Sequence, residues 1–244
     1  MEFLEYIGSA LVYTGYFLLA GVLPWIIFAL ITHKISDSLR KSLASILSLK
    51  GYIFLTAPGV MIHELSHAFF CLIFRHKIIE MKLFSPQSDG TLGYVQHQYD
   101  PQSLYQRCGN FFIGTGPVWG GVVLLCLLSS KLLPPFEEDY ASVMSLFTTS
   151  AFWLSFKSWI WLYLTLTILS HITLSGPDLK GAFDGGIAIV TAVLLLFVLF
   201  GWCGEWESEL IDNSKNLFFS FMPLLILFLL LSGTAAVIFR IFRK

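Results

Sequence analysis

The stretch GVMIHELSHAFF, from Gly59 to Phe70, places two histidines, a glutamate and a serine inside an otherwise apolar run. The residues before the histidines read FLTAPGVMI, and those after them read AFFCLIF. An ionisable group at membrane depth costs at least about 2.5–3.5 kcal/mol on insertion scales. Polar groups in such a segment therefore indicate a function.

The composition is that of an integral membrane protein. The chain of 244 residues is 56% hydrophobic and only 13% charged, whereas a typical soluble domain has about 25% charged residues. The net charge of −1 argues against nucleic acid as a partner, because binding to phosphates calls for basic patches. We expect the lipid bilayer to surround the protein.

Six apolar segments are long enough to cross a bilayer, which takes about 20 mostly apolar residues. They are Ile7–Thr32, Gly51–Phe74, Cys108–Ser130, Ser158–Pro177, Gly185–Gly204 and Asn216–Phe239. We predict an all-α polytopic membrane protein with about six transmembrane helices, in which residues 1–244 form a single membrane domain. Pro177 should end the fourth helix, because proline cannot continue the backbone hydrogen bonding.

The longest polar segment, Arg75–Arg107, predicts a small β-hairpin between the second and third helices. Asp89-Gly90 is a turn signal, and the following TLGYVQHQY alternates apolar and polar residues as a strand does. We assign the hairpin to Leu83–Tyr99. Its edge must be paired or buried in protein if it lies at membrane depth, and it could pair with an extended substrate.

The spacing of the two histidines predicts a metal site. His63 and His67 are four residues apart and share one face of a helix, so their imidazoles could hold one zinc ion with bonds of about 2.0–2.1 Å. Glu64 lies about 100° around the helix from His63, where it would reach a water molecule beside the metal. This H-E-x-x-H order is typical of metalloproteases.

A catalytic zinc site usually takes three protein ligands. The candidates near apolar spans are His97, His171, Asp178 and Asp184. Asp178 lies among glycines, which allow an irregular turn from which an acid could reach a neighbouring helix. The residues alone leave the choice open.

Three motifs resemble the site-2 protease family of intramembrane zinc metalloproteases. They are HELSH, GNFFIGTGPVWGG at Gly109–Gly121 and SHITLSGPDLKG at Ser170–Gly181. In that family a helix with H-E-x-x-H is followed by a hairpin, a helix opening with Gly-Pro and a later helix with an Asp. The resemblance covers roughly residues 51–186, the expected metalloprotease core. It departs at the Asp motif, where Ser170 and Thr173 replace the usual Asn and Pro, and no PDZ-like insert is present.

The resemblance implies a zinc metalloendopeptidase that binds one Zn²⁺ per chain through His63, His67 and Asp178. Glu64 would act as general base on the attacking water and later pass a proton to the leaving amine. The implied substrate is a membrane protein cut in or near a transmembrane segment. We expect a multi-pass protein of a prokaryotic cell (inner) membrane.

Two further residues are candidates for substrate binding. His97 could donate a hydrogen bond to the oxyanion or act as a temporary fourth ligand. Asn110 could line a water path together with Ser66 and Thr115.

Two other functional classes compete with the protease. A zinc-binding scaffold or sensor would need no general base, so the presence of Glu64 argues against it. A zinc transporter needs ligands along its whole path, and Ile7–Thr32 and Asn216–Phe239 contain no acids.

Overall fold

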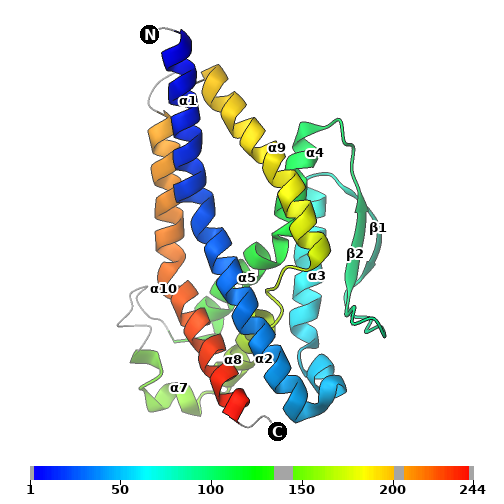
Figure 1. Cartoon of the computed structure of the whole chain (residues 1–244). Coiled ribbons are helices and arrows are strands. Elements are labelled where there is room, and N and C mark those ends of the chain that lie inside the picture. The colour runs from blue at the N-terminus through cyan, green and yellow to red at the C-terminus, as the bar shows by residue number, and fades with distance from the viewer. Residues whose placement is uncertain (1–2, 135–144, 201–205, 242–244) are drawn as a thin grey trace.

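The computed structural model describes residues 3–134, 145–200 and 206–241, which form helices and one two-stranded sheet (Figure 1). The elements are α1 (Phe3–Phe17), the π-helix η1 (Leu18–Val22), α2 (Leu23–Leu55), α3 (Ala57–Ile73), β1 (Lys77–Lys82), β2 (Tyr94–Gln98), α4 (Leu104–Gly114), α5 (Gly116–Leu132), α7 (Ser150–Leu154), α8 (Phe156–Leu169), α9 (Gly176–Phe200) and α10 (Trp206–Ile241). This architecture agrees with the predicted helical fold and its small hairpin.

The helices form an elongated bundle with the sheet on its outside. In Figure 1, α1, η1 and α2 follow one another as one long rod with α10 beside it, and α9 approaches the bundle centre from one end. α3 packs against α4, α5 and α8, and α4 packs against α9. The main hydrophobic core includes Leu125 of α5, Trp161 of α8 and Phe228 of α10, all fully buried.

The described residues contain between two and four candidate membrane spans. Leu4–Leu55 and Gly176–Phe200 are long and apolar enough by themselves. Two bent pairs bring the number to four, namely α4 with α5, bent by 61°, and the two halves of α10, bent by 42°. α3 and α8 have only 17 and 14 residues, so the predicted six spans are not confirmed. The end of the predicted span Gly185–Gly204 lies outside the described residues.

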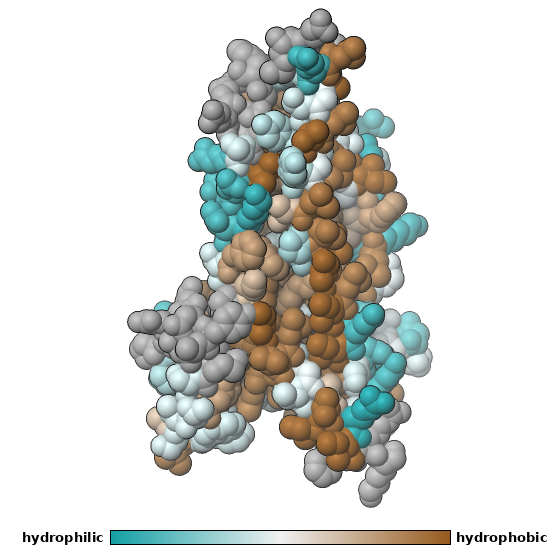
Figure 2. Space-filling view, turned by 60° about the vertical axis from the view of Figure 1, so that its left-hand side comes forward, coloured by the Kyte–Doolittle hydropathy of each residue, from teal (hydrophilic) through white to brown (hydrophobic). Residues whose placement is uncertain are grey.

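Apolar side chains cover the outside of the bundle. Figure 2 shows a band of hydrophobic residues along the length of the molecule. α3 exposes Met61, Leu65, Phe69 and Leu72 at helical spacing, whereas Glu64 and His67 are buried. A helix with apolar residues outside and polar residues inside suits a lipid environment.

Prolines begin three of the helices around the bundle centre. Pro58, Pro117 and Pro177 lie in the first turns of α3, α5 and α9. The first N–H groups of a helix have no partner within it, so proline is tolerated there. The prediction that Pro177 ends a helix is therefore wrong, because α8 already ends at Leu169 and Pro177 begins α9.

The hairpin is longer than predicted. β1 pairs antiparallel with β2 from Lys77 opposite Gln98 to Lys82 opposite Tyr94, with an irregularity between Ile78 and Glu80. The predicted range Leu83–Tyr99 contains β2 but omits β1, because KIIEMK lacks a clean alternation. Residues 83–93 form the connecting loop, with Gly90 at φ 94° in its turn.

Candidate metal centre

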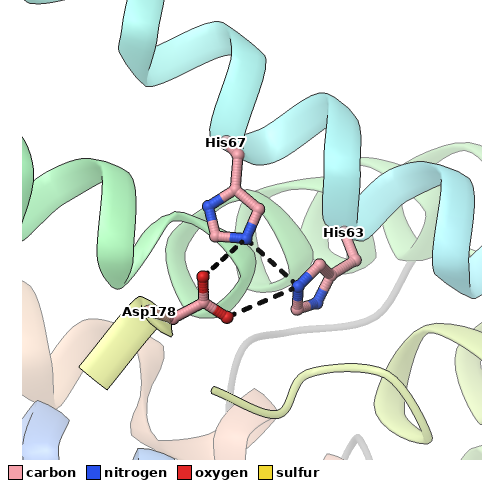
Figure 3. Close-up of side chains that lie close together, drawn as sticks. All are labelled: His63, His67 and Asp178. Carbon is pink, nitrogen blue, oxygen red and sulfur yellow. Dashed lines mark hydrogen bonds and ion pairs between the residues drawn. The ribbon is translucent and has the colours of Figure 1, made fainter. Parts of the chain in front are cut away.

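Three potential metal ligands meet where α3 faces the first turn of α9 (Figure 3). The Nε2 atoms of His63 and His67 are 3.1 Å apart. The carboxylate of Asp178 lies 3.3 Å from Nε2 of His67 and 3.8 Å from Nε2 of His63. Within residues 3–134, 145–200 and 206–241, no other group of three or more His, Cys, Asp or Glu side chains converges in this way.

Backbone carbonyls orient both imidazoles. Nδ1 of His63 lies 2.8 Å from the carbonyl oxygen of His171, and Nδ1 of His67 lies 2.7 Å from that of Ile113. A carbonyl oxygen only accepts, so each Nδ1 carries a proton, and in the neutral form of each ring Nε2 offers its lone pair to a metal ion. Two lone pairs and a carboxylate thus face one another, an arrangement that a bound cation would stabilise.

The distances fit a metal ion. Tetrahedral ligands with bonds of 2.0–2.1 Å are separated from one another by about 3.3 Å. The three pairs at this site measure 3.1, 3.3 and 3.8 Å. His63, His67 and Asp178 could therefore hold one ion with only small side-chain movements.

The start of α9 positions the acid. The backbone N–H of Ser175 donates to Oδ2 of Asp178 at 2.8 Å, and the N–H of Asp178 lies 3.3 Å from Oγ of Ser175. This reciprocal pair is a capping box, and it fixes the carboxylate at the end of the helix nearest the histidines. Asp184 is exposed on α9 and does not join the group.

His171 supports the centre but is not one of the converging ligands. Its backbone carbonyl accepts from His63, while its side-chain Nε2 lies 2.9 Å from Oγ1 of Thr56. Of the four candidates for the third ligand, Asp178 is thus the one that the structure brings to the histidine pair.

Small residues let the supporting helices approach. A Cβ atom at Gly114 of α4 would overlap the carbonyl oxygen of Asp178, and one at Gly185 of α9 would overlap the backbone nitrogen of Phe111. Glycine permits such close helix contacts inside membranes. The close packing of α4 on α9 brings the Ile113 carbonyl and Asp178 to the same side chain, His67.

A cavity of about 680 Å³ opens onto the three candidate ligands. Glu64 lines it from α3, Asn110 from α4, and residues 89–95 line it from the hairpin loop and β2. All of its lining residues fall between Val60 and Gly181. They lie inside the range 51–186, whose assignment as a metalloprotease core stays a prediction.

Glu64 lies next to the three candidate ligands and is not part of their group. The residue is only 7% exposed, and a Cβ at Gly93 would come within 2.8 Å of the Glu64 Cγ. The loop between the strands therefore approaches Glu64 as closely as glycine allows. In the part of the chain that the structure describes, Glu64 forms no side-chain hydrogen bond or ion pair, and it lines the cavity beside the three candidate ligands.

The other predicted polar residues divide into two groups. His97 and Asn110 line the cavity, and His97 stands outside the group of candidate ligands. Their role in substrate binding stays a prediction. Ser66 donates to the Ile62 carbonyl and Thr115 to the Phe111 carbonyl. Neither hydroxyl lines the cavity, so the water path past Ser66 and Thr115 stays a prediction.

Two residues near the centre, Gly93 and His76, were not predicted from the sequence. Gly93 could have been noticed as a second glycine after Asp89-Gly90, but its closeness to Glu64 depends on the fold of the loop. His76, which contacts His97, had no motif around it.

No protein-family model matches the chain, and no curated protein or solved structure matches it either.

Proposed function

We propose that the protein is an intramembrane zinc metalloprotease, similar in kind to the site-2 proteases. The observation that carries this proposal is the convergence of His63, His67 and Asp178 beside Glu64 in one cavity. An imidazole pair with both Nδ1 atoms bonded to carbonyls, together with one carboxylate, matches the donor set of catalytic zinc sites.

The ligands and Glu64 divide the chemistry between them. The chemistry that zinc supplies when bound is Lewis-acid activation of water and of a carbonyl group. The side chain of Glu64, next to His63 in the sequence, has no hydrogen-bond partner among the described residues. As general base it takes a proton from water, and it later passes one to the leaving amine. Asn110 offers an amide on the cavity wall for binding the substrate.

The surroundings favour a membrane-protein substrate. The outside of α3 is apolar, so a transmembrane segment of another protein can approach through lipid. The sheet lies beside the cavity and offers a strand edge for an unwound segment. We further propose that α3 and α8 complete a set of six membrane-embedded helical segments in a prokaryotic cell membrane.

The variant Glu64→Gln tests the proposal. The amide resembles the carboxylate in shape and leaves both histidines in place, so zinc content and fold should be retained. Turnover of a membrane-protein substrate should fall by about 10²–10⁴-fold, which is what general acid–base catalysis typically contributes. The alternative, a zinc-binding scaffold or sensor, requires that cellular output be the same for Glu64→Gln and wild type.

A further inference from the structure

A second histidine pair lies beside the candidate metal centre. His76 follows α3 and is only 4% exposed, and His97 lies in β2 and lines the cavity. Their Nδ1 atoms are 3.0 Å apart. The His76 ring also stacks on Tyr99, with centroids 5.1 Å apart and planes 16° apart, so its orientation is set from two sides.

The end of α3 holds His76 in this place. Arg75 has φ 57°, and the N–H of His76 donates to the Cys71 carbonyl at 2.8 Å. These features are those of a Schellman motif, which ends a helix and turns the chain sharply. Because His76 immediately follows the turn, its ring is placed by the backbone of the same helix that carries His63, Glu64 and His67.

The partners of His76 define where the protons lie. Nε2 of His76 is 2.8 Å from the carbonyl oxygen of Gln106, which can only accept, so this nitrogen carries a proton. Burial lowers the pKa of both His76 and His97, so both are neutral near pH 7. A neutral His76 then has a bare Nδ1, and Nδ1 of His97 must be the donor between them. The second nitrogen of His97, Nε2, is left without a proton.

We propose that His97 presents a bare Nε2 to the cavity and accepts a hydrogen bond from a backbone N–H of the substrate, with His76 as the positioning residue that fixes this tautomer. The inference rests on the proposed function. It replaces the expected role of His97 as a donor to an oxyanion, because a bare nitrogen repels an oxyanion.

Because His97 is a hydrogen-bond acceptor and not a donor, it also defines the class of substrate. In an intact helix each interior N–H is already bonded to a carbonyl four residues earlier. An acceptor in the cavity therefore favours a segment that has unwound and has free N–H groups. His97 would thus help the site to distinguish an unwound peptide from a folded transmembrane helix.

The tautomer is tested without any assay of activity. Nitrogen-15 NMR of the zinc-loaded protein with labelled histidine reports which ring nitrogens carry protons, and the His97→Gln spectrum assigns the signal. We expect a protonated Nδ1 and a bare Nε2 for His97. His76→Asn, which keeps an acceptor near the Nδ1 position, should preserve this state, whereas His76→Gln should release a mixture of tautomers. A proton on Nε2 of His97 in the wild type would overturn the proposal.

The acceptor role is tested by binding in the Glu64→Gln background, where turnover is slow. The probe is a fluorescent extended peptide of small apolar residues in detergent, and the readout is anisotropy. His97→Leu should weaken binding by about 3- to 10-fold, the loss expected for one hydrogen bond. His97→Gln, which places a carbonyl oxygen near the Nε2 position, should restore most of it.

Equal peptide affinity in Glu64→Gln alone and in its combinations with His97→Leu and His97→Gln would overturn the acceptor role. Absence of binding by all three proteins would overturn it too. Melting temperatures of the variants show whether each is folded. The two proposals can fail separately. If binding depends on His97 but the protein with Glu64 intact cleaves no substrate, this inference is supported and the proposed function is contradicted.

Discussion

Asp178→Asn should weaken zinc binding by at least about 100-fold. The Asp178 carboxylate lies 3.3 and 3.8 Å from the two histidine nitrogens, close enough to share one ion with them. The amide keeps an acceptor for the Ser175 N–H, so α9 should begin as before and only the charged ligand is lost. Residues that merely hydrogen-bond to ligands already contribute about 10–100-fold, so losing a ligand should cost more than about 2.7 kcal/mol.

Competition between the metal-free protein in detergent and a chromophoric chelator measures this affinity. Two matched variants control for indirect effects. Ser175→Ala removes the hydroxyl of the capping box but leaves the carboxylate, so its loss should stay below about 10-fold. Asp184→Asn removes an exposed acid of the same helix and should change affinity by about threefold or less. Unchanged affinity in Asp178→Asn, or an equal loss in Asp184→Asn, would refute the ligand assignment.

Three further predictions concern stability, measured by thermal unfolding in detergent with tryptophan fluorescence. Gly185→Ala should destabilise the protein by about 1–3 kcal/mol because its Cβ overlaps the backbone of Phe111, whereas Gly186→Ala, with 3.7 Å of clearance, should not; equal effects would contradict the close helix contact. Arg75→Gly should stabilise by up to about 1 kcal/mol, since φ 57° strains any residue with a Cβ, and a lower melting temperature would count against this. Burial lowers the pKa of His97 to about 4, below its ordinary value of about 6.5, so the folded state binds fewer protons and stability should fall as pH drops from about 6.5 towards 4. The loss at pH 5.5 should be less than about 1.4 kcal/mol because solvent screens the partly exposed ring. His97→Gln should flatten the dependence of stability on pH; the same dependence in both proteins would exclude His97 as its source.

The histidines and Glu64 could be predicted from sequence because they lie on one short helix. A spacing of four residues in an apolar segment fixes their common face, whatever surrounds it. The third ligand could not be chosen in this way. Asp178 and Asp184 lie in the same glycine-containing segment, Gly176–Gly186, and only the capping box with Ser175 and the packing of α9 on α4 bring one of them to the site.

The number of spans was harder to predict because hydropathy does not show where a helix breaks. The segment Ser158–Pro177 reads as one apolar run, yet α8 ends at Leu169 and a new helix begins at Gly176. The break has a structural consequence, since it frees the His171 carbonyl to accept a hydrogen bond from His63. The sequence likewise does not show which ring nitrogen of His97 carries the proton. That depends on His76 and on the Gln106 carbonyl, which only the folded chain brings together.

The most direct test of zinc-dependent proteolysis is mass spectrometry of peptides cleaved in water enriched in oxygen-18. The purified, zinc-loaded protein is reconstituted in liposomes with a pool of single-span membrane peptides. We predict a cut in or near the spanning segment, one oxygen-18 atom in the new carboxyl terminus, and loss of both when zinc is removed or when Glu64 is replaced by Gln. A pool that stays intact with the zinc-loaded wild type, or cleavage that continues in Glu64→Gln, would contradict this prediction.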